Sequence, residues 1–427
     1  MKAVIMAGGK GTRLYNLTQD QIPKPMVCVN GKPILRWQIE NLKENRINDI
    51  IIVIGHLGEQ IQEYFDDGAR FGVSITYIKE KTPLGTGGAI YMLKDILYED
   101  FLLVYGDLIF NIDISRMYQY HKEHQAYATL FVHPNSHPLD SDLIVTDKDN
   151  RIINIDSKHN TRNYWYHNCT NAGVYMLSPI ICSDVMPNHP TSLDELLWYQ
   201  IQEGRKIYAY YSSEYVHDVG TLIRLTTTER DLYWDIPQKR NLKNKQKAIF
   251  LDRDGVINKE VGLLYNEDQF ELLPTAGEAL RNINHSSYLA IVVTNQSVIA
   301  RGLCTEEELE NIHKKMETLL GDKGAYVDKI YYCPHHPDDG YPEEVPSYKI
   351  KCDCRKPNIG MILKAAEDFN IDLSSSWIIG DRNTDIQTGI NAGLHTVLVG
   401  DRESNVIPDY AVENVYKAVQ IILGESV

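Results

Sequence analysis

Two acidic side chains lie one residue apart directly after an apolar run. Asp252 and Asp254 follow Lys247–Leu251, which is typical of a buried strand, and Gly255 lets the chain turn sharply after them. Residues two apart on an extended chain point the same way, so these carboxylates would repel each other unless a cation or a phosphoryl reaction required them. The pair therefore indicates an aspartyl nucleophile with an acid/base partner.

Three later segments place further polar groups at strand ends or before a helix. Thr294 and Asn295 end the next apolar strand, Arg355 and Lys356 precede a helical pattern, and Asp381 follows another strand. Each of these features alone is as compatible with polar capping as with catalysis. Because the carboxyl ends of parallel strands meet at one edge of a sheet, the whole set predicts a single catalytic crevice.

Four side chains between these segments have the spacing of a zinc site. Cys333, His335, Cys352 and Cys354 offer three thiolates and one imidazole, enough for a closed tetrahedral Zn²⁺ site, with His336 as the competing imidazole. The loop that they would close is rich in Pro, Asp and Glu, so metal binding would stabilise it. No open ligand position is evident, so we interpret the zinc as structural. The simpler alternative is that these are four unrelated, reduced side chains and form no metal site.

These segments resemble the haloacid dehalogenase-like phosphatases, which hydrolyse phosphomonoesters through an aspartyl phosphate. The motifs Asp252–Gly255, Thr294–Ser297, Ala300–Gly302 and Cys352–Pro357 narrow the resemblance to D-glycero-D-manno-heptose-1,7-bisphosphate 7-phosphatases, over about residues 245–425. The histidinol-phosphate phosphatases are close relatives with a similar zinc loop. The resemblance implies a phosphatase domain with a mostly parallel sheet.

The resemblance also implies a role for each matched residue. Asp252 is then the nucleophile and Asp254 the general acid/base. The other implied roles are phosphoryl binding by Thr294 and Lys356, substrate contact by Asn295 and Arg355, and Mg²⁺ binding by Asp252, Asp254 and Asp381. Val298 and Ile359 replace a glycine and a proline that are usual in the family, from which we expect altered loop packing.

A second group of motifs lies near the N-terminus. A glycine-rich turn follows the first strand, and such a turn lets backbone N–H groups approach a phosphate chain. Its predicted nucleotide contacts are Gly8, Gly9, Gly11, Thr12 and Arg13. A glycine turn alone is a weak signal, but Lys24 follows between two prolines. Together they predict a phosphate-binding site.

Three later segments extend this site. Pro83–Gly88 offers a flat surface for a base and ribose through Gly85, Thr86 and Gly88. Asp107 ends a buried strand and Asp218 lies further on; each aspartate alone is more often a helix cap. Together the two carboxylates are what a catalytic Mg²⁺ among triphosphate oxygens requires.

These residues resemble the sugar-1-phosphate nucleotidyltransferases over about residues 1–232, through Gly9–Leu14 and Pro23–Pro25. The resemblance implies that Arg13 and the loop amides hold a nucleoside triphosphate and that Lys24 lies near the sugar phosphate. It implies that Arg13 and Lys24 are catalytic and that Asp107 and Asp218 are Mg²⁺ ligands. It further implies sugar or phosphate contacts by Lys24, Lys158, Asn171 and Gly173. The glutamate of the family's E-K-P segment is absent before Lys158, so the sugar is not fixed by this motif.

The elements that must position these groups fall into two α/β domains. Strand-like and helix-like runs alternate in both halves, which predicts two mostly parallel sheets flanked by helices, the first Rossmann-like and the second haloacid dehalogenase-like. We predict domains at 1–235 and 247–427, with 236–246 as a polar, basic linker. A solvated loop inside one domain is the alternative interpretation of that stretch.

Composition excludes several other classes. The net charge of −15 argues against a nucleic-acid binder, and no apolar run reaches the roughly 18 residues of a membrane span. We therefore expect a cytoplasmic protein with small-molecule substrates and no membrane partner. The 7 cysteines do not form a disulfide framework, since three cluster and the rest are scattered. Homo-oligomerisation is left open.

The two resemblances fit consecutive reactions. Removal of the 7-phosphate from heptose bisphosphate gives heptose 1-phosphate, which a guanylyltransferase would join to GMP from GTP, releasing pyrophosphate. The alternatives are a mannose-1-phosphate guanylyltransferase fused to a histidinol-phosphate-like phosphatase, or one half acting as a regulatory module. The second alternative predicts a lost catalytic residue, whereas Arg13, Lys24, Asp107 and Asp218 are all present.

Overall fold

The computed structural model describes residues 1–9, 18–338, 340–401 and 404–424, and its contacts divide the chain into two compact units. Unit 1 comprises Met1–His133, Asp142–Ser157 and Asn171–Asn241. Unit 2 comprises Pro134–Ser141, Lys158–Thr170 and Leu242–Val427. Two short segments from the first half of the chain are therefore part of unit 2.

Among the described residues, unit 1 is built on a nine-stranded mixed sheet, in which β10-β9-β11-β6-β1-β4-β5 are successive neighbours and β8 pairs with β11 and β12. The strands are β1 (Ala3–Ala7), β4 (Asp49–Ile54), β5 (Ser74–Lys79), β6 (Phe101–Tyr105), β8 (Ala128–His133), β9 (Leu143–Thr146), β10 (Ile152–Asp156), β11 (Thr170–Leu177) and β12 (Ile207–Tyr211). The strands β6, β1, β4 and β5 are parallel, whereas β11 runs antiparallel to β6. The sequence predicted the parallel part and did not reveal the antiparallel extension.

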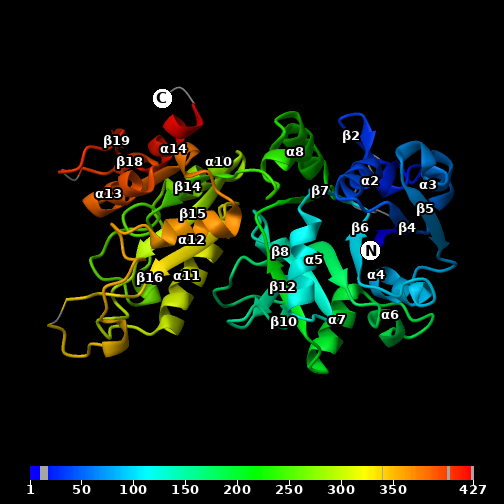
Figure 1. The fold of residues 1–427 in the computed structure, drawn as a ribbon, viewed down its shortest axis with the longest axis horizontal. Coiled ribbons are helices and arrows are strands. Elements are labelled where there is room, and N and C mark those ends of the chain that lie inside the picture. Colours follow the sequence, from blue (N-terminus) through cyan, green and yellow to red (C-terminus); the bar gives the residue numbers. More distant parts are fainter. Residues whose placement is uncertain (10–17, 339, 402–403, 425–427) are drawn as a thin grey trace. The chain divides into compact units, whose positions relative to one another are not determined.

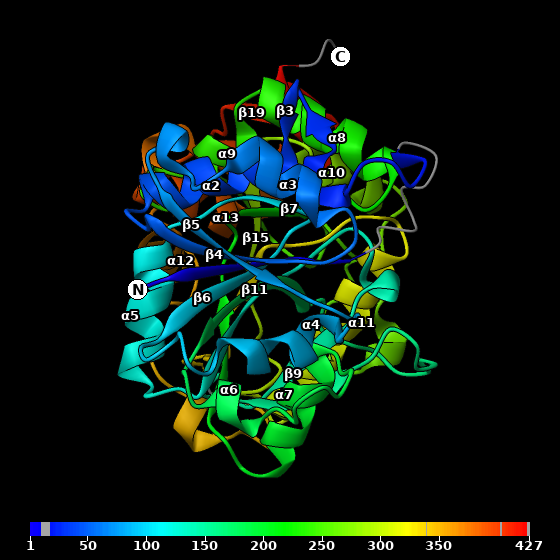
Figure 2. The same cartoon turned by 90° about the vertical axis from the view of Figure 1, so that its right-hand side faces the viewer.

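Helices cover both sides of the central strands (Figure 2). On one side are α2 (Ile34–Glu44) and α3 (Gly58–Phe65), whose buried Leu35, Ile39, Ile61 and Phe65 pack on alternate residues of β1 and β4. On the other side are α4 (Gly85–Gly88), α6 (Ile181–Asp184) and α7 (Leu193–Gln202). A strand buried on both faces needs an uninterrupted apolar sequence, which explains the runs AVIMA and DIIIVI.

Unit 2 contains an all-parallel sheet that, within the described ranges, has six strands in the order β16-β15-β14-β17-β18-β19. They are β14 (Lys247–Leu251), β15 (Tyr288–Asn295), β16 (Lys329–Cys333), β17 (Trp377–Gly380), β18 (His395–Val399) and β19 (Tyr410–Val412). The flanking helices are α10 (Ala276–Asn284), α11 (Glu306–Gly321), α12 (Gly360–Phe369), α13 (Asn383–Ala392) and α14 (Val415–Leu423) (Figure 1). The predicted α/β class is confirmed for both units.

Helix α11 shows how local sequence sets these elements. Thr305 and Glu308 form a capping box at its start, and three glutamates in the first turn favour the positive end of the helix dipole. Leu309, Ile312 and Met316 recur at helical spacing and are buried in the core of unit 2. The apolar face of α11 thus packs on the core of unit 2, and its opposite face does not belong to this core.

The segment 236–246, predicted to be a linker, begins with the short helix α9 (Ile236–Lys239). Asn241 donates to Asn111 Oδ1 at 2.6 Å in unit 1, and Leu242 accepts from Asn370 Nδ2 at 3.0 Å in unit 2. Hydrogen bonds therefore anchor this stretch along most of its length, as Asn244 O also accepts from Asn370 Nδ2 at 3.1 Å.

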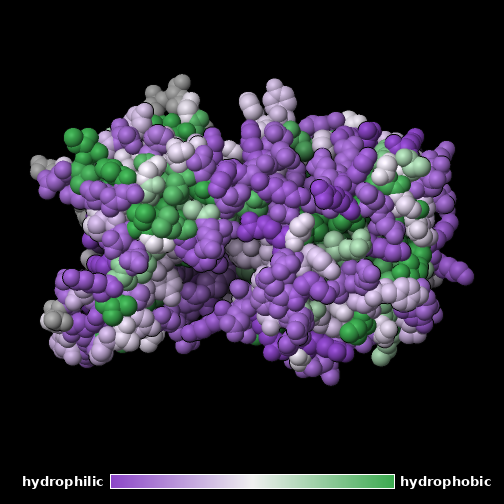
Figure 3. All heavy atoms as spheres, in the orientation of Figure 1, coloured by the Kyte–Doolittle hydropathy of each residue, from purple (hydrophilic) through white to green (hydrophobic). Residues whose placement is uncertain are grey.

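Hydrophilic side chains make up most of the visible surface of each unit, with apolar side chains in small groups (Figure 3). Every helix that the structure describes is too short or too polar to traverse a lipid bilayer.

Candidate functional sites

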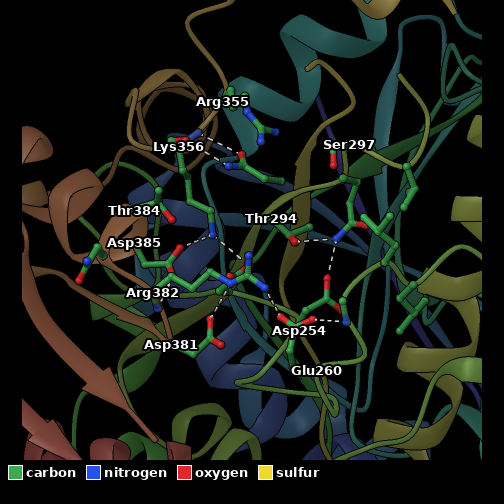
Figure 4. A pocket seen from close by; sticks show the side chains of 18 of the residues that line it. Asp254, Glu260, Thr294, Ser297, Arg355, Lys356, Asp381, Arg382, Thr384 and Asp385 are labelled. Atoms are coloured by element: carbon green, nitrogen blue, oxygen red, sulfur yellow. Dashed lines mark hydrogen bonds and ion pairs between the residues drawn. The ribbon is translucent and has the colours of Figure 1, made fainter. Parts of the chain in front are cut away.

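The predicted crevice of unit 2 lies at the carboxyl edge of its sheet (Figure 4). Asp252 follows β14, Thr294 and Asn295 end the neighbouring β15, and Asp381 follows β17 on the other side of β14. These side chains line a cavity of about 700 Å³ together with Asp254, Lys356 and Arg355. The structure thus brings every predicted phosphatase residue to one place.

Lys356 is the cationic centre of this cavity. Its buried Nζ lies 2.9 Å from Asp252 Oδ1 and 2.6 Å from Asp385 Oδ1, and it donates to Val293 O at 2.9 Å. Burial alone would lower the pKa of Lys356, but Asp252 and Asp385 raise it. Burial raises the pKa of Asp252 to about 7, against the opposing effect of Lys356. The lysine ammonium therefore opposes the effect of burial and favours the charged form of Asp252.

Asp254 occupies a different environment two residues away. It accepts from Arg253 Nη2 at 2.9 Å, from Asn258 Nδ2 at 2.9 Å and from Gln296 Nε2 at 2.9 Å. Although burial opposes it, the Arg253 guanidinium and these hydrogen bonds lower the pKa of Asp254. Neighbouring aspartates with pKa values moved in opposite directions suit two different roles in one reaction.

Two residues of β15 are held by second partners. Gln296 Nε2 also donates to Thr294 Oγ1 at 2.9 Å, which fixes the hydroxyl at the edge of the cavity. Asn295 accepts from Lys356 N at 3.0 Å and donates to Lys356 O at 3.1 Å. The side chain predicted to contact substrate therefore fixes the backbone of Lys356.

The structure groups Asp252, Asp381 and Asp385 as a candidate metal site, with one oxygen of each within 4.8 Å of the others. Three buried carboxylates are a fitting donor set for a hard divalent cation. Gly255 has φ +82°, and a Cβ there would lie 2.4 Å from Asp381 Oδ2, so glycine is required for the approach. The predicted set has Asp254 where this group has Asp385; Asp254 pairs with Arg253 and Asp385 with Lys356, and the Mg²⁺ ligands stay a prediction.

The predicted zinc ligands lie together as a second candidate metal group. Cys333, Cys352 and Cys354 have Sγ–Sγ distances of 3.1–3.5 Å, and His335 Nδ1 lies 3.4 Å from Cys354 Sγ. Ligands of a tetrahedral zinc ion at about 2.3 Å would be roughly 3.8 Å apart, so the set fits after a small expansion. His336, the competing imidazole, instead faces Arg301 Nη2 at 3.2 Å.

Arginines connect this group to the cavity. Arg355, next to Cys354 in the chain, donates to His335 O at 3.1 Å, and both Arg355 and Arg301 line the cavity. Arg382 also lines it and pairs with Glu260. The loop with the candidate zinc ligands therefore holds Arg355 beside this cavity.

The candidate site of unit 1 gathers at the ends of β1 and β6. Lys24, in a short 3₁₀ helix (Lys24–Met26), forms an ion pair with Asp107. Strand β13 (Tyr215–Asp218) runs antiparallel to β7 (Leu108–Asn111), which places Asp218 beside Asp107. Arg224 donates to both oxygens of Asp218, at 2.8 and 2.9 Å. The predicted aspartates are neighbours, each next to a cation.

The glycine loop is described only at its start. Gly8 and Gly9 follow β1, and no described residue lies within 4 Å of the position that a Cβ of Gly9 would occupy. The predicted contacts Gly11, Thr12 and Arg13 lie outside the described residues. The contact of this loop with a phosphate chain stays a prediction.

The glycines of the second predicted nucleotide segment also have a packing role. Cβ atoms at Gly85 and Gly88 would lie 2.5 Å from the backbone oxygens of Thr191 and His189. Thr86 Oγ1 accepts from Leu193 N at 2.9 Å, at the start of α7. Close approach of α4 to the 189–193 segment thus explains these small residues, and their nucleotide contact stays a prediction.

Glu80 is a candidate that the sequence reasoning missed. It follows β5 and accepts from Leu84 N at 3.1 Å, and a Cβ on Gly8 would lie 2.2 Å from Glu80 Oε2. Burial raises the pKa of Glu80. The only sequence signal was its place after a strand next to the glycine loop.

The predicted sugar contacts fall in different units. Asn171 donates to Tyr175 Oη and Asp194 Oδ1, both at 2.7 Å, and accepts from Gly173 N at 3.1 Å, within unit 1. Lys158 begins a segment that belongs to unit 2. That Lys158, Asn171 and Gly173 share one sugar site stays a prediction.

Comparison with known proteins matches both halves. The family model "Nucleotidyl transferase" matches residues 2–233, and a model of hydrolases like the haloacid dehalogenases matches residues 353–418. A D-glycero-beta-D-manno-heptose-1,7-bisphosphate 7-phosphatase of Haemophilus ducreyi is 41% identical over 152 residues, which are 35% of this chain and 81% of that protein. A D-glycero-alpha-D-manno-heptose-1,7-bisphosphate 7-phosphatase of Burkholderia mallei is 40% identical over 162 residues, covering 38% and 84%.

Solved structures also match each half. The D,D-heptose 1,7-bisphosphate phosphatase of B. bronchiseptica, solved with magnesium and phosphate, is 32% identical and covers 42% of this chain and 100% of that one, with a TM-score of 0.38. HddC from Yersinia pseudotuberculosis is 24% identical and covers 54% and 99%, with a TM-score of 0.48.

Proposed function

The chain belongs to two families, the nucleotidyl transferases and the heptose-1,7-bisphosphate 7-phosphatases, and we propose that this bifunctional enzyme carries out two consecutive steps of one synthesis. The first step removes the 7-phosphate of D-glycero-D-manno-heptose 1,7-bisphosphate. The second transfers GMP from GTP to the resulting heptose 1-phosphate, giving GDP-heptose and pyrophosphate. The observation that carries the proposal is the convergence of the phosphatase residues on one cavity in a chain that also has a nucleotidyltransferase half.

In the phosphatase step, a carboxylate oxygen of Asp252 attacks the phosphorus of the 7-phosphate and the sugar oxygen leaves with a proton from Asp254. A bound phosphate opposes the effect of Arg253 and increases the proton affinity of Asp254. Water then attacks the aspartyl phosphate, and Asp254 accepts its proton, so inorganic phosphate is released. Lys356 and Thr294 hold the phosphoryl oxygens during both transfers.

The cationic wall of the cavity favours a substrate with a second phosphate. Arg355 and Arg301 both line it, and neither is needed for the aspartyl chemistry. A guanidinium binds a phosphate through paired N–H donors. These side chains support a sugar bisphosphate over a sugar monophosphate as the substrate.

In the transferase step, heptose 1-phosphate attacks the α-phosphorus of the nucleotide and pyrophosphate leaves. Lys24 would hold the sugar phosphate, and Arg13 with the amides of Gly8 and Gly9 would hold the triphosphate. Positioning and charge neutralisation supply most of the rate in such transfers. Asn171 and Gly173 would contact the sugar.

Divalent cations fit both steps. Mg²⁺ bound by Asp252, Asp381 and Asp385, and by Asp107 and Asp218, would neutralise phosphate charge. Zn²⁺ bound by Cys333, His335, Cys352 and Cys354 would be structural, since four protein ligands leave no open position. We place both activities in the cytoplasm, where nucleoside triphosphates are available.

Glu80 supports guanine as the base. A carboxylate can accept two hydrogen bonds side by side, and guanine presents N1–H and the N2 amino group as adjacent donors. Adenine presents an acceptor at N1, which a carboxylate would repel. Glu80→Gln should therefore lower kcat/KM for GTP by about tenfold, the effect of one buried polar contact in recognition.

The direct test gives the intact enzyme the heptose bisphosphate with GTP, ATP, CTP or UTP in turn, and measures phosphate and pyrophosphate separately. We expect phosphate in every reaction and rapid pyrophosphate release with GTP alone. Faster release with another nucleotide would overturn the guanylyl assignment. Preference for histidinol phosphate or mannose 1-phosphate over the heptose substrates would overturn the assignment of heptose as the sugar.

A further inference from the structure

The wall of the phosphatase cavity contains one acidic residue that the proposed reaction does not use. Among the described residues that line the cavity, the acidic ones are Asp252, Asp254, Asp381, Asp385 and Glu260. The four aspartates form the acid/base pair and the candidate metal group, which leaves Glu260. A carboxylate is unfavourable in a cavity for an anionic substrate unless a cation or a hydrogen-bond donor offsets its charge.

The loop that carries Glu260 is anchored at Asp254, the proposed general acid/base. The buried Asn258 donates through Nδ2 to Asp254 Oδ1 at 2.9 Å and accepts from Gly255 N at 2.7 Å. Glu260 lies two residues further along the chain, so its Cα is within about 7 Å of the Cα of Asn258. The carboxylate therefore belongs to the part of the cavity wall that follows the general acid.

Two contacts fix the direction of the Glu260 carboxylate. Oε1 accepts from Gly262 N at 2.5 Å, and Oε2 forms an ion pair with Arg382 Nη2. The side chain of Glu260 is 18% exposed. Because a carboxylate oxygen has two lone pairs, each of these oxygens can accept a second hydrogen bond from a molecule in the cavity.

Arg382 reaches this carboxylate from the loop after β17, the strand next to β14. Its backbone N donates to Asp385 Oδ2 at 3.0 Å, at the start of α13, and its Nε lies 3.8 Å from Asp381 Oδ1. The side chains of Arg382 and Glu260 thus meet in the cavity wall (Figure 4). The guanidinium offsets the charge of Glu260, so the carboxylate can remain beside an anionic substrate.

The chemistry of the reaction indicates which part of the substrate faces Glu260. The leaving oxygen must lie within hydrogen-bond distance of Asp254 to take its proton, so the sugar lies on this side of the cavity. Arg355 and Arg301 offer donors for the second phosphate. The remaining groups of the substrate are hydroxyls, which donate hydrogen bonds, and a carboxylate is the acceptor that binds them most strongly.

We propose that Glu260 is a specificity-determining residue of the phosphatase, accepting hydrogen bonds from hydroxyl groups of the leaving sugar. Arg382 is its positioning residue, since it fixes the direction of the carboxylate and offsets its charge. The proposal rests on the proposed phosphatase step and deepens it. It assigns the polyhydroxylated part of the substrate to a group outside the catalytic set.

The test compares two substrates of the full-length enzyme by release of inorganic phosphate. One is the heptose bisphosphate, and the other is 1,7-heptanediol bisphosphate, which has both phosphates and no hydroxyl. Glu260→Gln should lower the ratio of their kcat/KM values about tenfold, as expected for the loss of a charge-assisted hydrogen bond. Both substrates are measured on one preparation, so a change in the amount of folded enzyme cancels in the ratio. The altered charge of the cavity acts on both bisphosphates and cancels as well.

Arg382 provides the second pair of variants. Arg382→Met should lower the same ratio about fivefold, because Glu260 then loses the contact that directs it. Arg382→Lys keeps a cation for the carboxylate and should retain most of the wild-type ratio. A ratio as low in Arg382→Lys as in Arg382→Met would overturn the positioning role of this charge.

Glu271→Gln is the matched control. Glu271 pairs with Lys259 at 3.5 Å, next to Glu260 in the chain, but its side chain is 70% exposed and is absent from the described lining of the cavity. Its substitution should leave both kcat/KM values unchanged. An unchanged ratio in both Glu260→Gln and Glu260→Ala, or an equal fall in the control, would overturn the role of Glu260.

The wild-type enzyme separates this result from the proposed function. If it does not prefer the heptose bisphosphate to 1,7-heptanediol bisphosphate, the assignment of the sugar substrate fails. If it has this preference and the Glu260 variants keep it, only the role of Glu260 fails.

Discussion

The two candidate catalytic sites are built in different ways. In unit 2, the catalytic groups lie at successive ends of one parallel sheet, and the side chains of Lys356 and Asp385 are 2% and 0% exposed. In unit 1, the corresponding ion pairs are more open, since the side chains of Asp107 and Asp218 are 27% and 30% exposed. They come from a turn and a small second sheet instead of adjacent parallel strands.

The difference concerns how much of each site is complete before substrate binds. The phosphatase centre has its cation and carboxylates already paired in a buried environment, which is the condition for electrostatic preorganisation. The transferase centre has its aspartates paired with Lys24 and Arg224 in a partly exposed environment. We therefore expect substitutions in the phosphatase centre to affect one activity sharply and those around the transferase centre to have graded effects.

The largest effect should come from Asp252→Asn. Without its nucleophile the phosphatase should lose on the order of 10³-fold or more in kcat, while nucleotidyl transfer to purified heptose 1-phosphate is unchanged. Phosphate and pyrophosphate release, measured on the same preparation, check this. Loss of both activities would contradict the model of two separate sites.

Asp107→Asn should be the sharpest test of the transferase centre. It removes a predicted metal ligand and the ionic partner of Lys24, so pyrophosphate release should fall by about 10²-fold. Steady-state kinetics with GTP and heptose 1-phosphate measure the change, and phosphatase activity in the same sample serves as the control. A normal kcat would remove Asp107 from the proposed mechanism.

Cys354→Ser should have a smaller, indirect effect. Losing one thiolate weakens the metal group, and Arg355, which is anchored to His335 O, loses its fixed position. We expect KM for the bisphosphate to rise about tenfold and bound zinc to fall, with nucleotidyl transfer unaffected. Metal analysis and phosphatase kinetics test this together; full activity in zinc-free protein would show that the loop needs no metal.

The phosphatase centre was largely predictable because its residues follow apolar strands. The runs before Asp252 and Asp381 are too apolar and too short to be anything but buried strands, and parallel strands place their ends together. Asp385 was harder to assign, because only the folded start of helix α13 shows that it reaches Lys356. Asn295 was predicted to contact substrate, but its side-chain amide forms hydrogen bonds with the backbone N and O of Lys356. No local sequence pattern encodes such a contact between distant residues.

The transferase half was less predictable for physical reasons. Its antiparallel strands β9, β10 and β11 have short, mixed sequences, and their pairing is fixed by tertiary contacts instead of periodicity. The segments 134–141 and 158–170 are polar and irregular, so the sequence contained no sign that they pack within unit 2. Glu80 was missed because one acidic residue after an edge strand is ordinary on a protein surface.

The smallest effect we predict is a pH-dependent change in the stability of the contact between His167 and α11. The carboxylates of Glu317 and Glu310, against the opposing effect of burial, raise the pKa of His167 from 6.5 to about 10. Its contribution to stability is therefore complete below about pH 6.5 and is lost as the pH rises through about 10. Because its side chain is 35% exposed, water screens the ion pairs and the contribution should be about 1 kcal/mol or less. Urea unfolding of the wild type and His167→Gln at pH 6.5 and 10 should show a difference that shrinks at the higher pH. A difference that is the same at both pH values would mean that His167 is not held as a cation, and the contact with α11 would then depend on packing and on the hydrogen bond from Tyr166 N to Thr318 Oγ1.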